Sequence, residues 1–158
     1  MDYFRFYISC SNSNHVSTFA NFNTMFRFSM ASNVVYNTDY RMKNLLPLAI
    51  ELAQNLPYSS HRVAAIITDR KNRVIATGFN SFVKTSPLQK KFAELVGEPS
   101  KVYNHAEIAS INALRYGSRP FAIYVARVNK AGEPLMAKPC KICQLALKDY
   151  QIKNIFHT

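Results

Sequence analysis

Two short motifs constrain this chain more than any other feature of its sequence. His105 begins an H-x-E motif, and residues 139–143 form a P-C-x-x-C motif. One imidazole nitrogen and two thiolates fill three positions of a tetrahedral zinc and leave the fourth open for water, whereas a structural zinc site closes all four. The sequence therefore predicts one zinc ion per chain, held by His105, Cys140 and Cys143, at a site that supports chemistry.

Both motifs fall where a helix is expected to begin. Residues 105–116 carry apolar side chains at a spacing of three to four and are followed by Gly117, a helix-ending residue, while Pro139 precedes a second helix over 140–149. A helix N-terminus has free N–H groups and a partial positive charge. Two such ends at one metal would stabilise thiolates and lower the pKa of both cysteines.

Glu107 has a different expected role. Its position relative to His105 makes it a poor fourth ligand. Zinc lowers the pKa of a bound water from 15.7 to about 7, and a carboxylate beside such a water suits a general acid/base. We therefore expect Glu107 to move protons.

Each motif alone permits other interpretations. H-x-E is common, and a lone C-x-x-C can be a redox pair, part of a structural zinc site or an accident. The two together, in this order and each at an expected helix start, form the signature of zinc-dependent nucleobase deaminases. The combination favours a catalytic zinc over a redox pair.

Length and cysteine count limit the class of protein. A chain of 158 residues with 48% hydrophobic residues is long enough for one domain with a proper core. It contains no run of 18 apolar residues, so no membrane partner is expected. Of three cysteines, only Cys10 lies outside the metal motif. This argues against a disulfide framework and favours a reducing, cytoplasmic location.

The net charge of +11 points to a partner that carries phosphate. The basic residues are scattered, with short pairs such as Arg70-Lys71, and no dense run resembles a nucleic-acid-binding tail. We take this pattern to favour a substrate of nucleotide size over a polymer.

Residues 1–40 differ in composition from the rest and are interpreted as an extension that is poorly ordered or loosely docked. They are rich in Asn, Ser and Phe and show no sustained helical period, although residues 3–8 are compatible with a short strand. An organelle transit peptide, or a biological start at Met30 or Met42, remains an alternative.

Residues 41–158 are expected to form the zinc-binding domain. The expected elements are a helix within 41–56 that starts near Asn44, a hairpin of strands 63–68 and 73–78, a short helix 88–96, the helix 105–116, a strand 121–128, a loop 129–137, the helix 140–149 and a strand 152–157. This alternation implies an α/β fold with a mixed sheet between helices.

Asn80 follows Gly78 at the end of an expected strand. A side chain at this place lies on the rim of the sheet, where open α/β sheets bind ligands. A turn-forming Asn is the commoner role. The long connection 81–104 follows, and such loops are often functional.

The segments RVAAIITDRKNRVIATGFN, NHAEIASI and KPCKICQLAL resemble the cytidine deaminase superfamily, and in particular its deoxycytidylate-deaminase-like branch. The resemblance covers about residues 42–157. It implies a three-layer αβα sandwich with about four to five strands, a zinc cofactor and hydrolytic deamination. It also implies residue roles: His105, Cys140 and Cys143 as zinc ligands, Glu107 as proton shuttle, Asn80 as a sugar contact, and the Ala106 backbone as a contact of the base.

The chain departs from the family in two ways. Family members usually have a fifth strand and further helices, whereas this sequence stops at Thr158. The open edge of a short sheet must be covered, and we expect the N-terminal segment or another subunit of a homo-oligomer to do so. No second set of Cys and His residues suggests a structural zinc.

These observations favour a cytosine nucleotide or nucleoside as substrate, with deoxycytidylate (dCMP) first. The lysines of the 81–104 connection could reach a 5′-phosphate: Lys84, Lys90, Lys91 and Lys101. Three alternatives remain. One is a deaminase of single-stranded DNA or RNA that stacks bases on Phe79, Phe82 and Tyr103. The others are action on another base, and a nucleic-acid-binding module with a vestigial zinc site.

Overall fold

The computed structural model describes residues 44–57 and 61–158. The expected N-terminal extension 1–40 and the expected strand 3–8 lie outside the described residues. Within the described part, no helix combines the length and the apolar character needed to cross a membrane.

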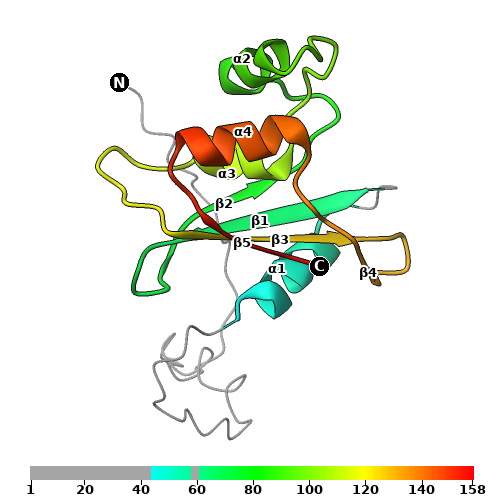
Figure 1. Ribbon diagram of the computed structural model, residues 1–158. Coiled ribbons are helices and arrows are strands. Elements are labelled where there is room, and N and C mark those ends of the chain that lie inside the picture. Colours follow the sequence, from blue (N-terminus) through cyan, green and yellow to red (C-terminus); the bar gives the residue numbers. More distant parts are fainter. Residues whose placement is uncertain (1–43, 58–60) are drawn as a thin grey trace, which may run out of the picture. The chain divides into compact units, whose positions relative to one another are not determined.

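Helices and strands alternate along the domain (Figure 1). In chain order they are α1 (Leu46–Gln54), β1 (Arg62–Thr68), β2 (Val74–Phe79), α2 (Pro87–Leu95), α3 (Ala106–Asn112), β3 (Ala122–Val128), β4 (Pro134–Leu135), α4 (Lys141–Asp149) and β5 (Asn154–His157).

The strands form one mixed sheet in the order β2-β1-β3, with β4 and β5 both paired to β3. Strand β1 is antiparallel to β2 and to β3, so the predicted hairpin is confirmed. Strand β5 runs parallel to β3, with Ile123 opposite Ile155. One expectation was wrong in detail: the 129–137 loop contains β4, in which Pro134 and Leu135 pair with the end of β3.

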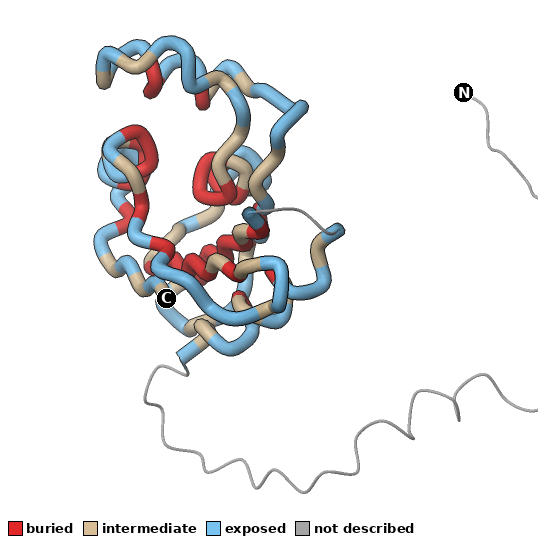
Figure 2. The backbone as a smooth tube through the Cα atoms, turned by 90° about the vertical axis from the view of Figure 1, so that its right-hand side faces the viewer, coloured by how far each residue is buried: buried red, intermediate tan, exposed pale blue. Residues whose placement is uncertain are grey.

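Helices cover both faces of the sheet, which confirms the predicted three-layer α/β architecture. Figure 1 shows α1 on one face and α3 and α4 on the other, with α2 lying over them. The buried part of the tube in Figure 2 runs through the sheet and the inner sides of the helices. The sheet therefore has two separate cores.

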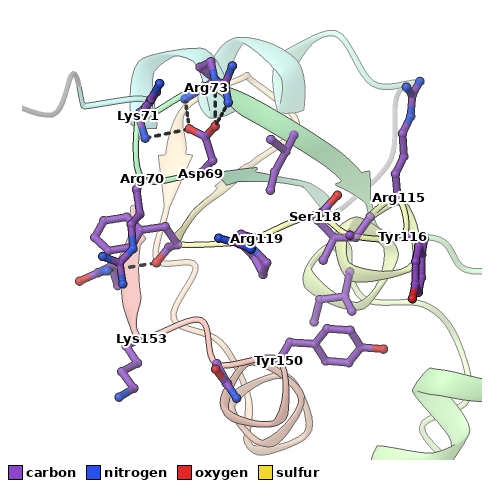
Figure 3. Close-up of a pocket in the computed structure, with 18 of the residues that line it drawn as sticks. Asp69, Arg70, Lys71, Arg73, Arg115, Tyr116, Ser118, Arg119, Tyr150 and Lys153 are labelled. Atoms are coloured by element: carbon purple, nitrogen blue, oxygen red, sulfur yellow. Dashed lines mark hydrogen bonds and ion pairs between the residues drawn. The ribbon is translucent and has the colours of Figure 1, made fainter.

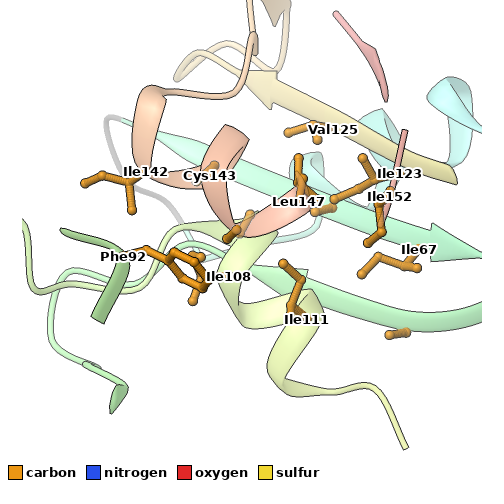
Figure 4. Close-up of a cluster of buried hydrophobic side chains, with 14 of the residues drawn as sticks. Ile67, Phe92, Ile108, Ile111, Ile123, Val125, Ile142, Cys143, Leu147 and Ile152 are labelled. Carbon is orange, nitrogen blue, oxygen red and sulfur yellow. The ribbon is translucent and has the colours of Figure 1, made fainter. Parts of the chain in front are cut away.

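The larger core lies between the sheet and α2, α3 and α4 (Figure 4). Residues Ile67, Ile123 and Val125 point into it from the strands and meet Ile108 and Leu147 from the helices. Successive side chains of a strand point to opposite faces, so Ile66 and Tyr124 pack on α1 instead. Tyr124 also stacks on Phe156 with ring centroids 4.8 Å apart.

Helix α3 is shorter than the predicted span 105–116. It ends at Asn112, because Ala113 closes the last helical turn and the amide of Leu114 bonds to the carbonyl of Ile111. Gly117 has a left-handed φ of +79°, but it lies in a separate turn beyond the helix. The chain thus leaves α3 one turn earlier than expected and forms a long connection to β3.

Candidate active site

The structure brings together the three predicted zinc ligands. His105 Nδ1 lies 3.4 Å from Cys140 Sγ and 3.3 Å from Cys143 Sγ, and all three ligand atoms are within 4.8 Å of one another. Two ligands at about 2.1 and 2.3 Å from a tetrahedral zinc are separated by about 3.5 Å. The cluster therefore fits one zinc ion, and its donor set of one imidazole and two thiols fits the open catalytic type.

Both motifs begin helices, as predicted. His105 is the N-cap of α3 and Cys140 is the N-cap of α4, and neither caps its helix with a side-chain hydrogen bond. Their side chains are thus free to turn toward a common point. Cys143 lies in the first turn of α4, where the N-terminal partial charge favours a thiolate.

The hydrogen bond between the two cysteine side chains favours a thiolate at Cys140. A hydrogen bond with the Cys143 thiol, above all, lowers the pKa of Cys140 to about 3. The pKa of Cys143 is raised, because its thiol is bound to Cys140 and is buried. A metal ion held between the sulfurs would favour loss of the second proton.

The Cys140 side chain also shifts the pKa of His105. Its hydrogen bond with Cys140 raises the pKa of the imidazole, and burial opposes this effect. A protonated ring cannot bind a metal. Zinc uptake at the cluster is therefore coupled to release of the Cys143 proton, and of the His105 proton when the ring is protonated.

Glu107 lies inside the site and is only 6% exposed. Burial raises the pKa of its carboxyl group, and the nearby His105 partly opposes the shift. A carboxyl group whose pKa is moved toward neutrality can both accept and donate a proton near pH 7.

Asn80 has a clear structural role at the rim of the sheet. Its side-chain Oδ1 accepts from the backbone N–H of Val63 at 2.8 Å, and its Nδ2 donates to the carbonyl of His61 at 2.9 Å. The side chain therefore ties the end of β2 to the start of β1. One amide hydrogen and one oxygen lone pair remain for another partner. Ala106 is buried at the first position of α3, directly after His105.

Gln89 is a site-shaping residue that the sequence analysis missed. It is fully buried on α2, its Nε2 donates to the carbonyl of Lys101 at 2.9 Å, and its Oε1 accepts from the His105 N–H at 3.4 Å. Gln89 thus fixes the segment between α2 and α3, and this segment positions His105 at the cluster. A signal existed, because Gln89 shares a helical face with the buried Phe92 and Ala93.

A cavity of about 320 Å³ is lined by the strand end and by the residue before His105. Asn80, Lys84 and Asn104 contribute polar groups to its wall. The Oδ1 atom of Asn104 is buried and has no hydrogen-bond partner within the described residues. A buried acceptor without a partner is costly, so this atom is suited to a donor group from a ligand.

The four lysines of the 81–104 connection have different environments. Lys90 and Lys91 form ion pairs with Glu94 and Asp149, at 4.0 and 3.8 Å. Lys101 is paired with Glu98. Lys84 forms no ion pair among the described residues and lies at the 320 Å³ cavity.

The match to a protein-family model agrees with this site. Residues 40–158 match the model of the cytidine and deoxycytidylate deaminase zinc-binding region. A comparison with curated proteins gave no match. Among solved structures, cytidine deaminase from Mycobacterium tuberculosis is 26% identical, with a TM-score of 0.44 over 72% of this chain and 80% of that one.

The cytidine deaminase from Mycobacterium leprae is 25% identical, with a TM-score of 0.45 over 71% of this chain and 82% of that one. The family match spans most of the sequence and includes every residue of the zinc cluster. The chain therefore belongs to the family of cytidine and deoxycytidylate deaminases, and it is a zinc-dependent hydrolase that deaminates cytosine.

Proposed function

We propose that this deaminase acts on a cytosine nucleotide, with dCMP favoured, and releases the uracil product and ammonia. The observation that carries the proposal is Lys84, a cation free of ion pairs among the described residues, at the cavity beside the zinc cluster. A lysine in such a place suits a phosphate group. A neutral nucleoside would leave it without a partner.

In the proposed mechanism, zinc would be held by His105, Cys140 and Cys143. When bound there, zinc supplies a water whose pKa is low enough for attack at neutral pH. As the water oxygen bonds to the ring carbon that carries the amine, Glu107 accepts one proton of the water and passes it to the neighbouring ring nitrogen. Glu107 then transfers the second proton of the water to the amine, so that the carbon–amine bond breaks and ammonia leaves. Burial of Glu107 supports this role, because it raises the pKa of the carboxyl group and so favours proton uptake.

The sugar and the base are assigned to the residues around the small cavity. We infer that Asn80 uses its remaining hydrogen-bonding groups on the sugar, and that the backbone of Ala106 contacts the base. Asn104 Oδ1 would accept from a sugar hydroxyl or the exocyclic amine, which would give this buried atom its missing partner.

Substrate choice is tested with cytidine, CMP, deoxycytidine, dCMP and a short cytosine-containing single strand, followed by loss of the amine absorbance. We expect the highest kcat/KM with dCMP. The Lys84→Ala variant should lose about tenfold on dCMP and little on deoxycytidine, because only the nucleotide has a phosphate to contact. Lys90→Ala removes an equal charge from α2 and serves as the control.

Two results would contradict this choice. Turnover of the single strand without turnover of dCMP would favour a polynucleotide substrate, for which Phe79, Phe82 and Tyr103 are exposed near the site. Activity only on an adenine or guanine compound would overturn the assignment of cytosine.

We also propose that residues 41–158 form the zinc-dependent deaminase domain, and the family match that starts at residue 40 supports this boundary. A variant without residues 1–38 is expected to stay folded and to bind one zinc.

Strand β5 pairs with β3 along one edge, and no strand of the described part pairs with the other edge of β5. We therefore propose that a second copy of the chain covers this free edge of β5. Light scattering should then show that the protein without residues 1–38 is still an oligomer. An insoluble or monomeric product would indicate instead that the N-terminal segment covers this edge.

A further inference from the structure

A second, larger cavity lies at the end of the sheet opposite the zinc cluster. It has a volume of about 1430 Å³ and is formed by the β1–β2 turn, the connection between α3 and β3, and the segment after α4 (Figure 3). Strand β1 starts beside Asn80 and ends at this turn. Its seven residues span roughly 20 Å at about 3.3 Å per residue. The cavity is thus separate from the catalytic site.

The cavity is wider than a pocket for one small molecule, for which about 300–1,000 Å³ is usual. The helices α3 and α4 begin at the zinc ligands and end at this cavity, so both ends of the domain are built on the same two helices. No residue of the proposed mechanism lines it. The cavity therefore needs an explanation other than deamination.

The rim is strongly basic. Five basic residues of the lining are exposed, and none of them forms an ion pair within the described residues (Figure 3): Arg70, Lys71, Arg115, Arg119 and Lys153. The two acidic residues of the lining are already engaged, Asp69 by Arg73 at 2.6 Å and Asp149 by Lys91 at 3.8 Å. The uncompensated charge suits a ligand with several phosphates.

Aromatic side chains stand among these charges. Tyr116 is fully exposed, and Tyr150 lies at the lower edge of the cavity in Figure 3. The guanidinium of Arg70 lies over the Phe121 ring at 5.7 Å from its centroid. An exposed tyrosine beside unpaired cations is the arrangement on which unpaired bases stack while the phosphate backbone follows the positive charge.

We propose that this basic cavity is a binding site for single-stranded nucleic acid, distinct from the deaminase site and used for binding rather than for chemistry. The phosphates lie against the lysines and arginines of the rim, and bases stack on Tyr116 and Tyr150. An extended nucleic-acid strand accounts at once for the volume of the cavity, the spread of the cations over three segments and the exposed aromatic rings. A single phosphate would use only part of this arrangement.

The test uses the zinc-loaded full chain and a fluorescent oligothymidylate of about twelve nucleotides, which contains no cytosine and cannot be a substrate. Fluorescence anisotropy at several salt concentrations gives the affinity and its salt slope. We expect measurable binding whose logarithm falls linearly with the logarithm of salt concentration, by about 0.7 for each phosphate contact.

Matched variants locate the site. Lys71→Gln with Lys153→Gln removes two charges from the cavity rim, and Lys90→Gln with Lys130→Gln removes two exposed lysines elsewhere. The rim variant should bind at least tenfold more weakly and lower the salt slope by about 1.4, the sum for two contacts. The control variant should change both values much less. Tyr116→Ala should cost about fivefold or more, while Tyr116→Phe keeps the stacking surface and most of the affinity.

Other outcomes overturn the proposal. Absence of binding at low salt would do so, as would equal losses in the rim and control variants, which would indicate diffuse surface charge. Binding of inorganic tripolyphosphate or of vesicles rich in phosphatidylserine as tightly as the oligonucleotide, with no effect of Tyr116→Ala, would assign the cavity to another anion. Deoxycytidylate turnover is measured in parallel, and its presence or absence leaves these results unchanged.

Discussion

Replacement of Glu107 by glutamine is expected to lower turnover of the cytosine substrate by several orders of magnitude while the protein keeps one zinc per chain. Acid/base catalysis alone contributes about 10²–10⁴ to a rate, and Glu107 is assigned more than one proton transfer. Glutamine has nearly the same shape but cannot accept a proton. Elemental analysis and a single-turnover assay on the same preparation measure both quantities.

The control for this experiment is Glu94→Gln, because Glu94 is exposed on α2 and pairs only with Lys90 among the described residues. It should keep full activity. If Glu107→Gln released the zinc, Glu107 would be a zinc ligand, and our assignment of the fourth coordination position as open to water would be wrong. Retained zinc with nearly normal turnover would show that another group carries the protons.

Replacement of Gly78 by alanine should disrupt the domain. A Cβ atom at Gly78 would lie 2.1 Å from the backbone nitrogen of Ser110 and 2.4 Å from the carbonyl oxygen of Ala106. Both contacts are with backbone, so no side-chain rotation can relieve them. Overpacking usually costs about 1–3 kcal/mol, and here strand β2 or helix α3 must also move.

Because α3 carries His105 at its N-terminus, its displacement should weaken zinc binding together with the fold. We expect Gly78→Ala to be insoluble, or to unfold at clearly lower urea concentration and to lose zinc to a chelator faster. Gly97→Ala is the matched control. Gly97 has open space around it and a positive φ of +80°, so alanine there should cost only about 1–2 kcal/mol. Equal stability of the Gly78→Ala variant and the wild type would show that β2 and α3 are not held at this distance.

Much of the catalytic centre could be predicted from sequence because its chemistry is local. The residues of H-x-E and of P-C-x-x-C begin two helices, and a helix start is marked by nearby residues such as Pro139. The hairpin of β1 and β2 could likewise be predicted from two apolar runs that are separated by a polar turn. In each case neighbouring residues in the chain were sufficient, since the signal depends on spacing of a few positions.

The surroundings of the site depend on residues that are distant in sequence. The contact of Gln89 with the His105 backbone forms only because α2 packs its Phe92 face on the domain.

The sequence by itself determined the residues of the zinc cluster, the carboxylate that we propose as the proton shuttle, and the hairpin, because short-range spacing sets them. It showed the positive charge only as scattered pairs and single residues. The tertiary structure alone decided that Lys71, Arg115 and Lys153, from three separate segments, surround one cavity at the end opposite the zinc cluster. The reason is physical: charges on a flexible chain have no fixed separation, and their summed field depends on the distances that the fold imposes.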